Sequence, residues 1–526
     1  MTIVTPEDAG QALVDAPSGP GTVPIEGGDF VDAGGVLEAG DPGAPAAVLA
    51  SLTVSPLALV PAFSPSTYDY AVRCAAGANP VTIAMTAGPG ALVDLVPSTG
   101  ATATTSSVDV SFNPDQAAVI QVTAGAATAQ YWIRCLPPDF PAITVTTYPA
   151  AGAPTPGWYL LSQSFTRNAG SVGNFAMILD GHGVPVWYRR ETQAVFNVEV
   201  RAMDAVSFIV DTVPAGFGTD TSATYQVDNL VSDTITTIPL PIEDGPTDVH
   251  ELRVLANGDN LVISTPLVSG VDLTGLAVAG IDGGAGSNAT VADCVLRELD
   301  PSGVLVWSWD ALDHIDPVAE STFPAAISFN GETVFDVFHC NSVDEAASSL
   351  AGAAAGDLLV SARHLDAVFV ISKATGSIVW KLNGAPSNKD DAKLIATSVD
   401  GAFYRQHDAR FLPNGQISLF DDQTAMPGPA RGIAYALDLD RRFAEITWQY
   451  AGPASSLAMG STRIYGDGDA IIGWGLPSTG GLVFSEVNAA NADVLDVSFG
   501  SAASYRAVKA PPGAFDLATL RNTAGE

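Results

Sequence analysis

The chain has 526 residues, which is more than one ordinary core needs, so we expect two or more domains. Only 15% of the residues are charged, and 57 Asp and Glu against 22 Lys and Arg leave a formal net charge of −35. This balance argues against nucleic acid or an anionic membrane as a partner, because binding to phosphate needs clustered positive charge. An anionic ligand would approach against the same field, so any anion site needs its own local cations.

Residues 1–48 form an acidic segment rich in Gly, Pro and Ala, which is typical of a tether. The N-terminus has neither the basic region nor the apolar core of a signal peptide. No window of about 20 apolar residues predicts a membrane span. Because such a tether suits an exported protein, we expect a secreted, periplasmic or cell-surface location, although the chain shows no export signal.

Residues 49–138 contain short alternating strands with turn signals about every 8–12 residues, which predicts a small β-sandwich. The sequence LASLTVSP, followed by PAFSPSTYDYAV, resembles the cadherin-like modules of bacterial surface proteins. That resemblance implies a support or contact role. Cys74 and Cys135 each end a predicted strand, in DYAVRC and QYWIRC. The matching contexts predict neighbouring strands joined by a disulfide, with buried free thiols as the alternative.

Residues 139–510 contain a repeat, in which an apolar strand and a polar or Gly turn lead into a second strand. The hairpins span 176–190, 224–238, 295–309, 368–382, 434–450 and 482–499. Four of them end near a tryptophan that we expect to pack between repeats, namely Trp187, Trp307, Trp380 and Trp448. Another strand pair precedes each hairpin, less clearly in the first unit. Four strands repeated six times predict a six-bladed β-propeller.

The predicted fold class is therefore all-β, with a six-bladed β-propeller preceded by a small β-sandwich. No segment shows a long helical period in its apolar residues. Residues 511–526 are predicted to form a C-terminal tail.

Three histidines fall at or near one position of the repeat. When the repeats are aligned on their second strands, His250, His339 and His407 stand at the start of the first strands of blades three, four and five. First strands line the central channel of a propeller, so these imidazoles should converge at one mouth. Arg363 ends the second strand of blade four, near the same mouth. Three of six histidines at one repeat position argue against an accidental arrangement.

The other histidines and the remaining cysteines have less definite roles. His182 lies in a turn and His314 follows a hairpin, so both are predicted on the surface, whereas the direction of His364 stays open. Cys294 and Cys340 belong to separate blades, and a disulfide between them would join adjacent blades. An even cysteine count without a C-x-x-C motif fits an oxidising compartment better than a metal site.

Three converging histidines suggest two chemistries. One is a zinc site, since zinc accepts three imidazoles and an open fourth position. Carboxylates that could orient such ligands lie close in sequence, at Asp248, Asp336 and Asp408. The other is anion chemistry, in which imidazoles act beside a guanidinium. Arg363 favours the second, because a metal repels a guanidinium whereas a tetrahedral anion binds it in bidentate fashion. We therefore predict neither a metal nor another cofactor.

Several blocks resemble the bacterial arylsulfate sulfotransferase family, over most of residues 155–500. They are DVHELRVLANGDNLVIS, FHCNSVDE, DLLVSARHLDAVFVISKATGSIVWKLNG and QHDARFLPNGQISLFDD. The resemblance implies a six-bladed propeller enzyme. Members of this family move a sulfuryl group from an aryl sulfate donor to a phenolic acceptor without a nucleotide donor. Both partners would be small molecules.

The resemblance also implies roles for single residues. His407 matches the nucleophile that becomes transiently sulfated, which would give ping-pong kinetics. His250, His339 and Arg363 match the residues that hold the sulfate oxygens and assist the departing phenol.

Weaker candidates for substrate contact surround these residues. Asn341 shares a strand face with His339, and Thr462 stands at the corresponding position of blade six. Aromatic side chains near the mouth could bracket aryl rings or simply pack between blades, namely Phe338, Phe403, Tyr404 and Tyr465.

Two other functions compete with transfer. A propeller can be a non-catalytic extracellular module that binds a ligand or another surface protein, because fold alone does not imply activity. The same site could also hydrolyse sulfate or phosphate esters with water as acceptor, with or without a metal. The sequence leaves the oligomeric state open, with a homodimer as one alternative.

Overall fold

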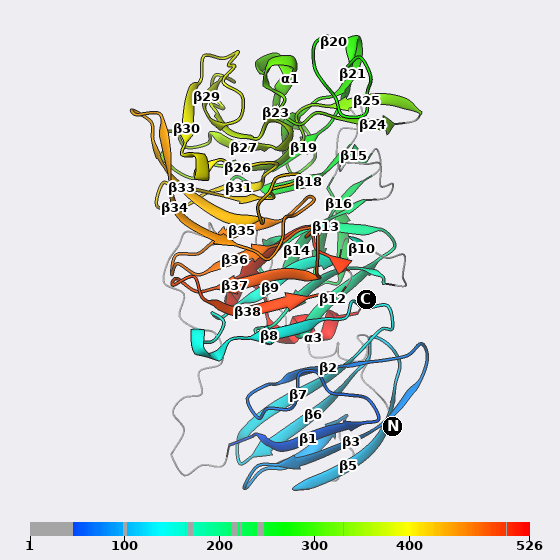
Figure 1. The fold of residues 1–526 in the computed structure, drawn as a ribbon. Helices are drawn as coiled ribbons and strands as arrows, with labels where there is room; N and C mark the ends of the chain where they lie inside the picture. The colour runs from blue at the N-terminus through cyan, green and yellow to red at the C-terminus, as the bar shows by residue number, and fades with distance from the viewer. Residues whose placement is uncertain are drawn as a thin grey trace.

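The computed structural model shows a chain built almost wholly of strands (Figure 1). The residues that it describes are 46–97, 103–163, 165–166, 172–211, 219–220, 223–238, 247–329, 331–500 and 502–525. The predicted tether, residues 1–48, therefore lies almost entirely outside them. Three short α-helices occur in the described ranges, α1 (Ala311–His314), α2 (Pro317–Glu320) and α3 (Leu517–Thr523). None of these described helices has the length and apolar character that crossing a membrane requires.

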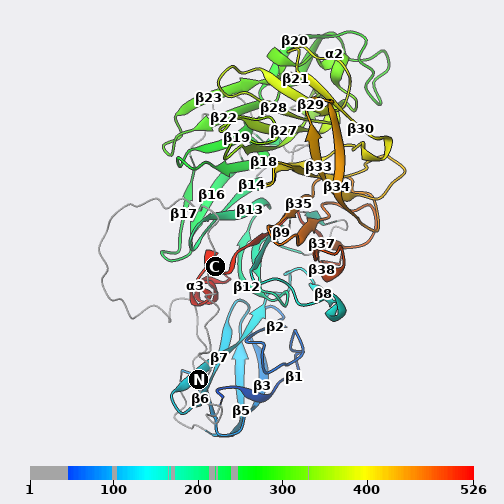
Figure 2. The same ribbon diagram turned by 90° about the vertical axis from the view of Figure 1, so that its left-hand side faces the viewer.

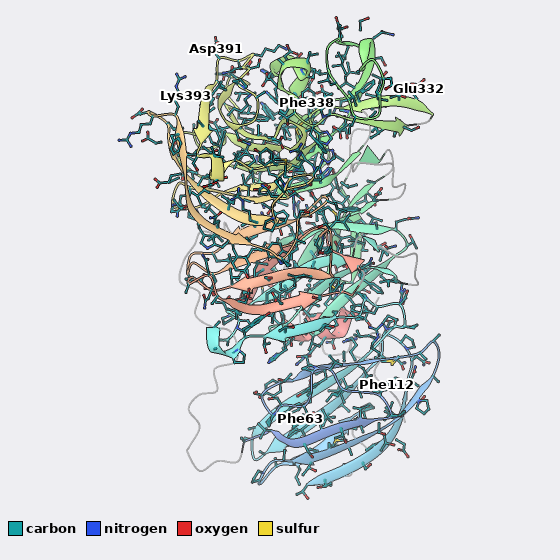
Figure 3. All side chains as sticks on the ribbon, in the orientation of Figure 1. Phe63, Phe112, Glu332, Phe338, Asp391 and Lys393 are labelled. Atoms are coloured by element: carbon teal, nitrogen blue, oxygen red, sulfur yellow. A yellow bond between two sulfur atoms is a disulfide. The ribbon has the colours of Figure 1, made fainter. Side chains whose placement is uncertain are left out.

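Two sheets, whose strands pair mostly antiparallel, pack face to face at the N-terminal end of the described chain. One contains β1 (Leu49–Ser55), β3 (Asn79–Ala87) and β5 (Thr105–Phe112). The other contains β2 (Asp69–Arg73), β7 (Ala127–Leu136), β6 (Ala117–Ala124) and β4 (Leu92–Val96). Burial alternates along β3, so one face of that strand turns to a core shared with Phe112 (Figure 3). The predicted sandwich is present, and its likeness to cadherin modules stays a prediction.

The disulfide of the sandwich joins two neighbouring parallel strands. β2 pairs with β7 so that Val72 stands opposite Cys135. Cys74, one residue beyond the end of β2, bonds to Cys135 with 5.6 Å between the Cα atoms. The predicted pairing of these two cysteines is confirmed.

The propeller is a series of antiparallel sheets whose strands follow the chain. The first series contains β9 (Trp158–Gln163), β11 (Asn174–Leu179) and β12 (Pro185–Glu191), and the next contains β13 (Ala194–Ala202), β14 (Ala205–Asp211), β16 (Thr224–Asn229) and β17 (Thr234–Thr237). Then come β18 (Thr247–Val254), β19 (Asn260–Ser264), β22 (Val295–Leu299) and β23 (Leu305–Asp310), followed by β26 (Cys340–Glu345), β27 (Leu358–Ala362), β28 (Ala367–Ile371) and β29 (Ile378–Asn383). The last two series contain β31 (His407–Phe411), β32 (Ile417–Asp421), β33 (Arg431–Asp438) and β34 (Phe443–Ala451), and then β35 (Ser461–Ile464), β36 (Ala470–Gly473), β37 (Leu482–Val487) and β38 (Asp493–Ser498).

All of the hairpins predicted from the repeat are formed, each as the third and fourth strands of such a series. Trp187 and Trp380 are fully buried between the sheets, as expected for packing side chains. The predicted class, an all-β chain with a β-sandwich before a β-propeller, is confirmed. The number of blades stays a prediction.

The first sheet is completed by the end of the chain. β40 (Ala507–Ala510) pairs with β9 and supplies the strand that no local repeat predicts. Conversely, a strand from before the first sheet joins the last one: β8 (Thr144–Thr147) pairs with β38 at the outer edge of that sheet. This exchange of strands across the two ends of the domain explains why the first unit of the repeat is unclear in the sequence.

A further sheet interrupts the repeat between β19 and β26. It contains β20 (Leu267–Leu273), β21 (Gly286–Ala292), β25 (Glu332–Asp336) and β24 (Ala325–Phe329). Figures 1 and 2 both place it at the end of the molecule that lies farthest from the sandwich. The segment that carries α1, α2 and this sheet returns to the propeller at Asp336, next to the histidines described below.

The predicted C-terminal tail is packed rather than extended. α3 lies between the sandwich and the first propeller sheet (Figure 1), and Leu520 is fully buried. Arg521 pairs with Asp69 of the sandwich at 2.7 Å. The buried Arg134 of β7 donates to the carbonyl of Arg521 at 2.6 Å. These contacts tie the two parts of the chain together.

The second disulfide joins two sheets of the propeller. Cys294 precedes β22 and bonds to Cys340 at the start of β26, with a sequence separation of 46 residues. The predicted pairing is confirmed, and it anchors the strand that follows His339.

Replacing both of these cysteines by serine should lower the free energy of unfolding of the propeller by roughly 2–4 kcal/mol, because the crosslink restricts the unfolded chain. Urea unfolding followed by tryptophan fluorescence measures the change. The matched control is the double Cys74→Ser, Cys135→Ser variant, which should weaken the sandwich instead. Equal stability of the Cys294→Ser, Cys340→Ser protein and the parent would contradict the prediction.

Candidate active site

The first strands of the propeller sheets lie side by side and bring three histidines together. β13 contacts β18, β18 contacts β26, β26 contacts β31, and β31 contacts β35. One ring nitrogen from each of His250, His339 and His407 lies within 4.8 Å of the other two. The ring centroid of His250 is 4.9 Å from that of His339 and 6.4 Å from that of His407. All three side chains are buried. The convergence that the repeat predicts is therefore present.

Local irregularities in these strands direct the imidazoles. The register of β31 against β32 shifts between His407 and Arg410, and that of β26 against β27 shifts beside Cys340. His339 and Asp408 take left-handed backbone conformations, with φ of 50° and 58°. A bulge of this kind turns a side chain out of the regular alternation and is frequent beside active sites. Regular strands would not bring all three rings to one point.

A carboxylate holds Nδ1 of each of the three imidazoles. Asp248 contacts His250 at 2.7 Å and Asp336 contacts His339 at 2.6 Å. Both partners are those that the sequence predicts. For His407 the partner is Asp422, at 2.7 Å.

Asp408, which is next to His407 in the sequence, does not hold its ring. Its left-handed conformation turns its carboxylate to Arg410 at 2.8 Å and to Arg463 at 2.6 Å. A neighbour in sequence thus belongs to a different network, while a residue fifteen positions later reaches the imidazole.

The hydrogen bonds of His407 define its tautomer. The backbone N–H of Met459 points at Nε2 at 3.2 Å, and an N–H can only donate. Nε2 therefore carries the lone pair, and Nδ1 carries the proton that it donates to Asp422. In this tautomer Nε2 is the nucleophilic nitrogen of the ring.

Burial favours the neutral form of two of the imidazoles, His339 and His407. It lowers the pKa of His339 to about 3, against the opposing effect of Asp336. It lowers the pKa of His407 well below the ordinary value of 6.5, and the charge of Arg363 acts in the same direction. Burial also raises the pKa of Asp422, so it disfavours charge on both members of that pair. These effects favour the neutral form of the His407 imidazole.

We expect attack by His407 to persist at mildly acidic pH. A lowered pKa means that the neutral imidazole survives as the pH falls, so the rate of modification of His407 should fall less between pH 8 and 5 than an ordinary imidazole would allow. An imidazole with a pKa of about 6.5 would lose roughly 30-fold in neutral form at pH 5. Quenched-flow measurement of the first turnover with 4-nitrophenyl sulfate gives this rate at each pH. Circular dichroism at pH 5 verifies that the protein stays folded. A 30-fold decrease would show an ordinary pKa.

Arg363 begins a 3-10 turn after β27 and completes the cluster. Its backbone N–H donates to the carbonyl of His339 at 3.0 Å. Its guanidinium, buried to 4% exposure, donates to Nε2 of His364 at 3.1 Å and to the carbonyl of Leu457 at 3.1 Å. Leu457 lies two residues before Met459, so one loop contacts both Arg363 and His407. The predicted position of Arg363 near the histidines is thus what the contacts show.

His364, whose direction the sequence leaves open, belongs to the cluster. Its ring stacks on His339 with 4.6 Å between centroids. Nδ1 lies 2.9 Å from the backbone carbonyl of Asp336, which can only accept, and Nε2 accepts from Arg363. His364 is therefore neutral in this network and orients the guanidinium of Arg363. His182 is the exposed surface histidine that the sequence predicts, whereas His314 is partly buried against Trp309.

Asn341 supports the strand that carries His407. Its amide donates to the backbone carbonyl of Gln406 at 2.7 Å, directly before His407. Gln406 in turn donates to the carbonyls of Ala362 and Ala367 in the neighbouring sheet. Thr462 is buried, and a Cβ placed on Gly432 would lie 2.9 Å from its hydroxyl, so its side chain packs against β33. Substrate contact by Asn341 and Thr462 stays a prediction.

The four candidate aromatic residues differ in position. Phe338 and Phe403 are fully buried in hydrophobic clusters, and Figure 3 shows Phe338 within the upper part of the propeller. Tyr465 bonds to the backbone of Lys509. Tyr404 is only partly buried and lies beside Arg405, near the cluster. The contacts favour packing roles for the first three.

A buried ionic circuit lies further along the same inner strands. Arg410 pairs with Glu251 at 2.6 Å, and Arg506 pairs with Glu251 at 2.9 Å. Ion pairs continue from strand to strand around the channel through Glu199, Arg253, Asp344, Arg410, Asp408 and Arg463. This circuit connects first strands of successive sheets and thereby fixes the spacing of the histidines above it.

The sequence did not single out several of these supporting groups. Asp422, Met459 and Arg506 come from strand ends and loops that carry no repeat signal. The pair of aspartates that ends QISLFDD was the one available hint of Asp422. Its pairing with His407 depends on the curvature of β31 against β32, which residue patterns do not encode.

The donor set also resembles that of a metal centre. Two overlapping groups could hold an ion, His250 with His339 and His407, and Asp336 with His339 and His364. Arg363 places a positive charge close to His407. That charge favours an anion over a cation at this point.

Curated proteins and solved structures show little similarity to this chain. No curated protein matches the sequence. Solved structures match at low similarity: a protein of unknown function from Bacteroides caccae (10% identity, 68% of this chain and 99% of that chain, TM-score 0.38), TolB from Acinetobacter baumannii (9% identity, 75% and 80%, TM-score 0.36) and the WD40 β-propeller domain of Doa1 (9% identity, 79% and 94%, TM-score 0.32).

The family model described as Arylsulfotransferase (ASST) matches residues 216–500, which is more than half of the chain. The match contains every residue of the histidine cluster and Arg363. The chain belongs to the arylsulfotransferase family.

Proposed function

We propose that the chain transfers a sulfuryl group from an aryl sulfate to a phenol through a sulfated His407, without a nucleotide donor. The observation that carries this proposal is the state of His407. Its Nε2 bears a lone pair, it is neutral, and it lies among two further imidazoles and a buried guanidinium. Family membership supports the same chemistry.

In the first half-reaction the Nε2 lone pair of His407 forms a bond to sulfur while the bond from sulfur to the aryl oxygen breaks. The electron pair of that bond leaves with the phenolate. Charge on the equatorial oxygens is offset by Arg363, and removal of one such donor typically costs about 10²–10³ in rate. Asp422 offsets the positive charge that the sulfated ring acquires.

His250 and His339 hold the sulfuryl oxygens and carry the proton. Each is backed by a carboxylate, and a bound anion offsets the burial cost of protonating them. One of them takes up a proton from solvent as the anionic donor binds, and gives that proton to the departing phenolate. In the second half-reaction the acceptor phenol attacks sulfur, loses its proton to the same base, and the electron pair of the N–S bond returns to Nε2.

The small-molecule partners are thus an aryl sulfate and a phenol. The two disulfides support an oxidising location, such as the periplasm or the outside of the cell. Because one site serves both half-reactions in turn, the proposal includes ping-pong kinetics.

Incubation with 4-nitrophenyl sulfate, with and without added phenol, tests the proposal. Transfer predicts that sustained nitrophenol release requires phenol, and that donor-treated protein carries one sulfuryl adduct on the peptide of His407. Release without phenol would instead indicate an ester hydrolase, and no release would indicate a binding module. Prior dialysis against a chelator should leave transfer unchanged, whereas loss that zinc restores would indicate the metal-dependent alternative.

A further inference from the structure

A second arginine stands beside the cluster without a hydrogen-bond partner for its guanidinium. Arg405 lies two residues before His407 and is 9% exposed. Its Nε is buried and unpaired, and no hydrogen bond joins the guanidinium to an acceptor among the described residues. A buried charge of this kind is costly unless something pairs with it.

The nearest carboxylate is already occupied. Asp366 accepts from the backbone N–H of Arg405 at 2.7 Å through one oxygen, and from the hydroxyl of Thr322 at 2.7 Å through the other. The guanidinium remains 3.5 Å from Asp366. The positive charge of Arg405 is thus only weakly neutralised by Asp366, although the whole chain has a net charge of −35.

Phe323 connects Arg405 to the site. The Cζ of Arg405 lies 4.2 Å from the centroid of the Phe323 ring, and the Cζ of Arg363 lies 5.5 Å from the same centroid. The Phe323 ring also meets His364 edge-on at 5.7 Å. The backbone N–H of Phe323 donates to the His364 carbonyl at 3.1 Å, which fixes the segment in place.

The two guanidiniums therefore share one aromatic neighbour, and Arg363 is the one that contacts the histidine cluster. Since both cations lie close to a single ring, one substituted benzene ring is long enough to contact both. Phe323 is partly exposed, so part of its ring is accessible beside the two guanidiniums.

We propose that Arg405 and Phe323 form a subsite next to the sulfuryl position that binds an aromatic substrate carrying a second acidic group, such as a carboxylate. The inference rests on the proposed transfer function and narrows its substrate class. The second acidic group occupies the free donors of Arg405, the ring lies against Phe323, and the phenolic oxygen reaches the sulfur on His407. The local cations also explain how an anion binds despite the charge of the whole chain.

The test compares two acceptors, 4-hydroxybenzoate and its methyl ester, with 4-nitrophenyl sulfate as the donor. The ratio of kcat/KM for the acid to kcat/KM for the ester measures recognition of the carboxylate. In Arg405→Gln this ratio should fall about tenfold or more relative to the parent chain, because a charge-assisted hydrogen bond is lost. The intrinsic reactivities of the acceptors cancel between the two proteins.

Two further variants sharpen the result. Arg442→Gln is the matched control, because Arg442 is exposed and also has a left-handed backbone (φ 54°), and its ratio should equal that of the parent. Phe323→Leu should raise KM for both acceptors and leave their ratio unchanged. The amount of sulfuryl adduct formed from the donor verifies that each variant is folded.

An unchanged ratio in Arg405→Gln would overturn the subsite. So would an equal loss on both acceptors, since Arg405 would then act on the sulfuryl group itself. A parent chain that forms no adduct would refute the proposed function, and this result is distinct from transfer without preference for the acid.

Discussion

The His407→Asn variant should lose at least about 10³-fold in kcat and form no sulfuryl adduct. Asparagine is smaller than histidine and offers no lone-pair nitrogen to attack sulfur, so the first half-reaction has no nucleophile. The measurement is nitrophenol release from 4-nitrophenyl sulfate in the presence of phenol, together with intact-mass analysis of the donor-treated protein. Nitrophenol release reports cleavage of the bond between the aryl oxygen and sulfur, and the adduct mass reports formation of the bond between Nε2 and sulfur.

His182→Asn is the matched control for that variant, because His182 is exposed and pairs only with groups outside the cluster. It should keep the activity and the adduct of the parent chain. An adduct that survives in His407→Asn would move the nucleophile to another residue and refute the assignment of His407.

The Asp422→Asn variant should lower kcat between about 10² and 10⁴-fold while the protein stays folded. Sulfation places a positive charge on the ring of His407, and the asparagine amide cannot offset it as the carboxyl group does. Because Asn and Asp are nearly equal in size, no cavity forms. Stopped-flow measurement of the first turnover separates this loss from any change in donor binding.

Asp421→Asn serves as its control. Asp421 is equally buried and adjacent, but its carboxylate binds Arg431 and the backbone of Tyr404, away from the imidazole. Its substitution should lower stability without lowering kcat. If both variants lost the same activity, the effect of Asp422 would be structural, and its role beside His407 would be disproved.

Much of this molecule follows from local residue patterns. Alternation of apolar and polar residues with period two predicted the strands, because each strand exposes one face to a core and the other to solvent. Turn residues at regular spacing predicted the hairpins, and repetition of the same position predicted that His250, His339 and His407 meet. These features depend only on residues within one repeat, so they can be seen without coordinates.

The failures share a physical cause. Strand β40 and the sheet of β20, β21, β24 and β25 were missed because ring closure and insertion join segments far apart in the chain. That Asp408 does not hold His407 was not visible in the sequence, because a bulge directs its side chain elsewhere. His364 could not be placed because a 3-10 turn replaces the expected strand at that point.

The sequence by itself determined the all-β class, the repeat, both disulfides and the three converging imidazoles, since each arises from periodic patterns or matching strand contexts. Only the tertiary structure decided which carboxylate holds each ring, which nitrogen of His407 carries the lone pair, and that the guanidinium of Arg405 makes no hydrogen bond beside Phe323. Those outcomes depend on bulges, loops and contacts between distant strands, where a displacement of about one residue changes the partner of every side chain.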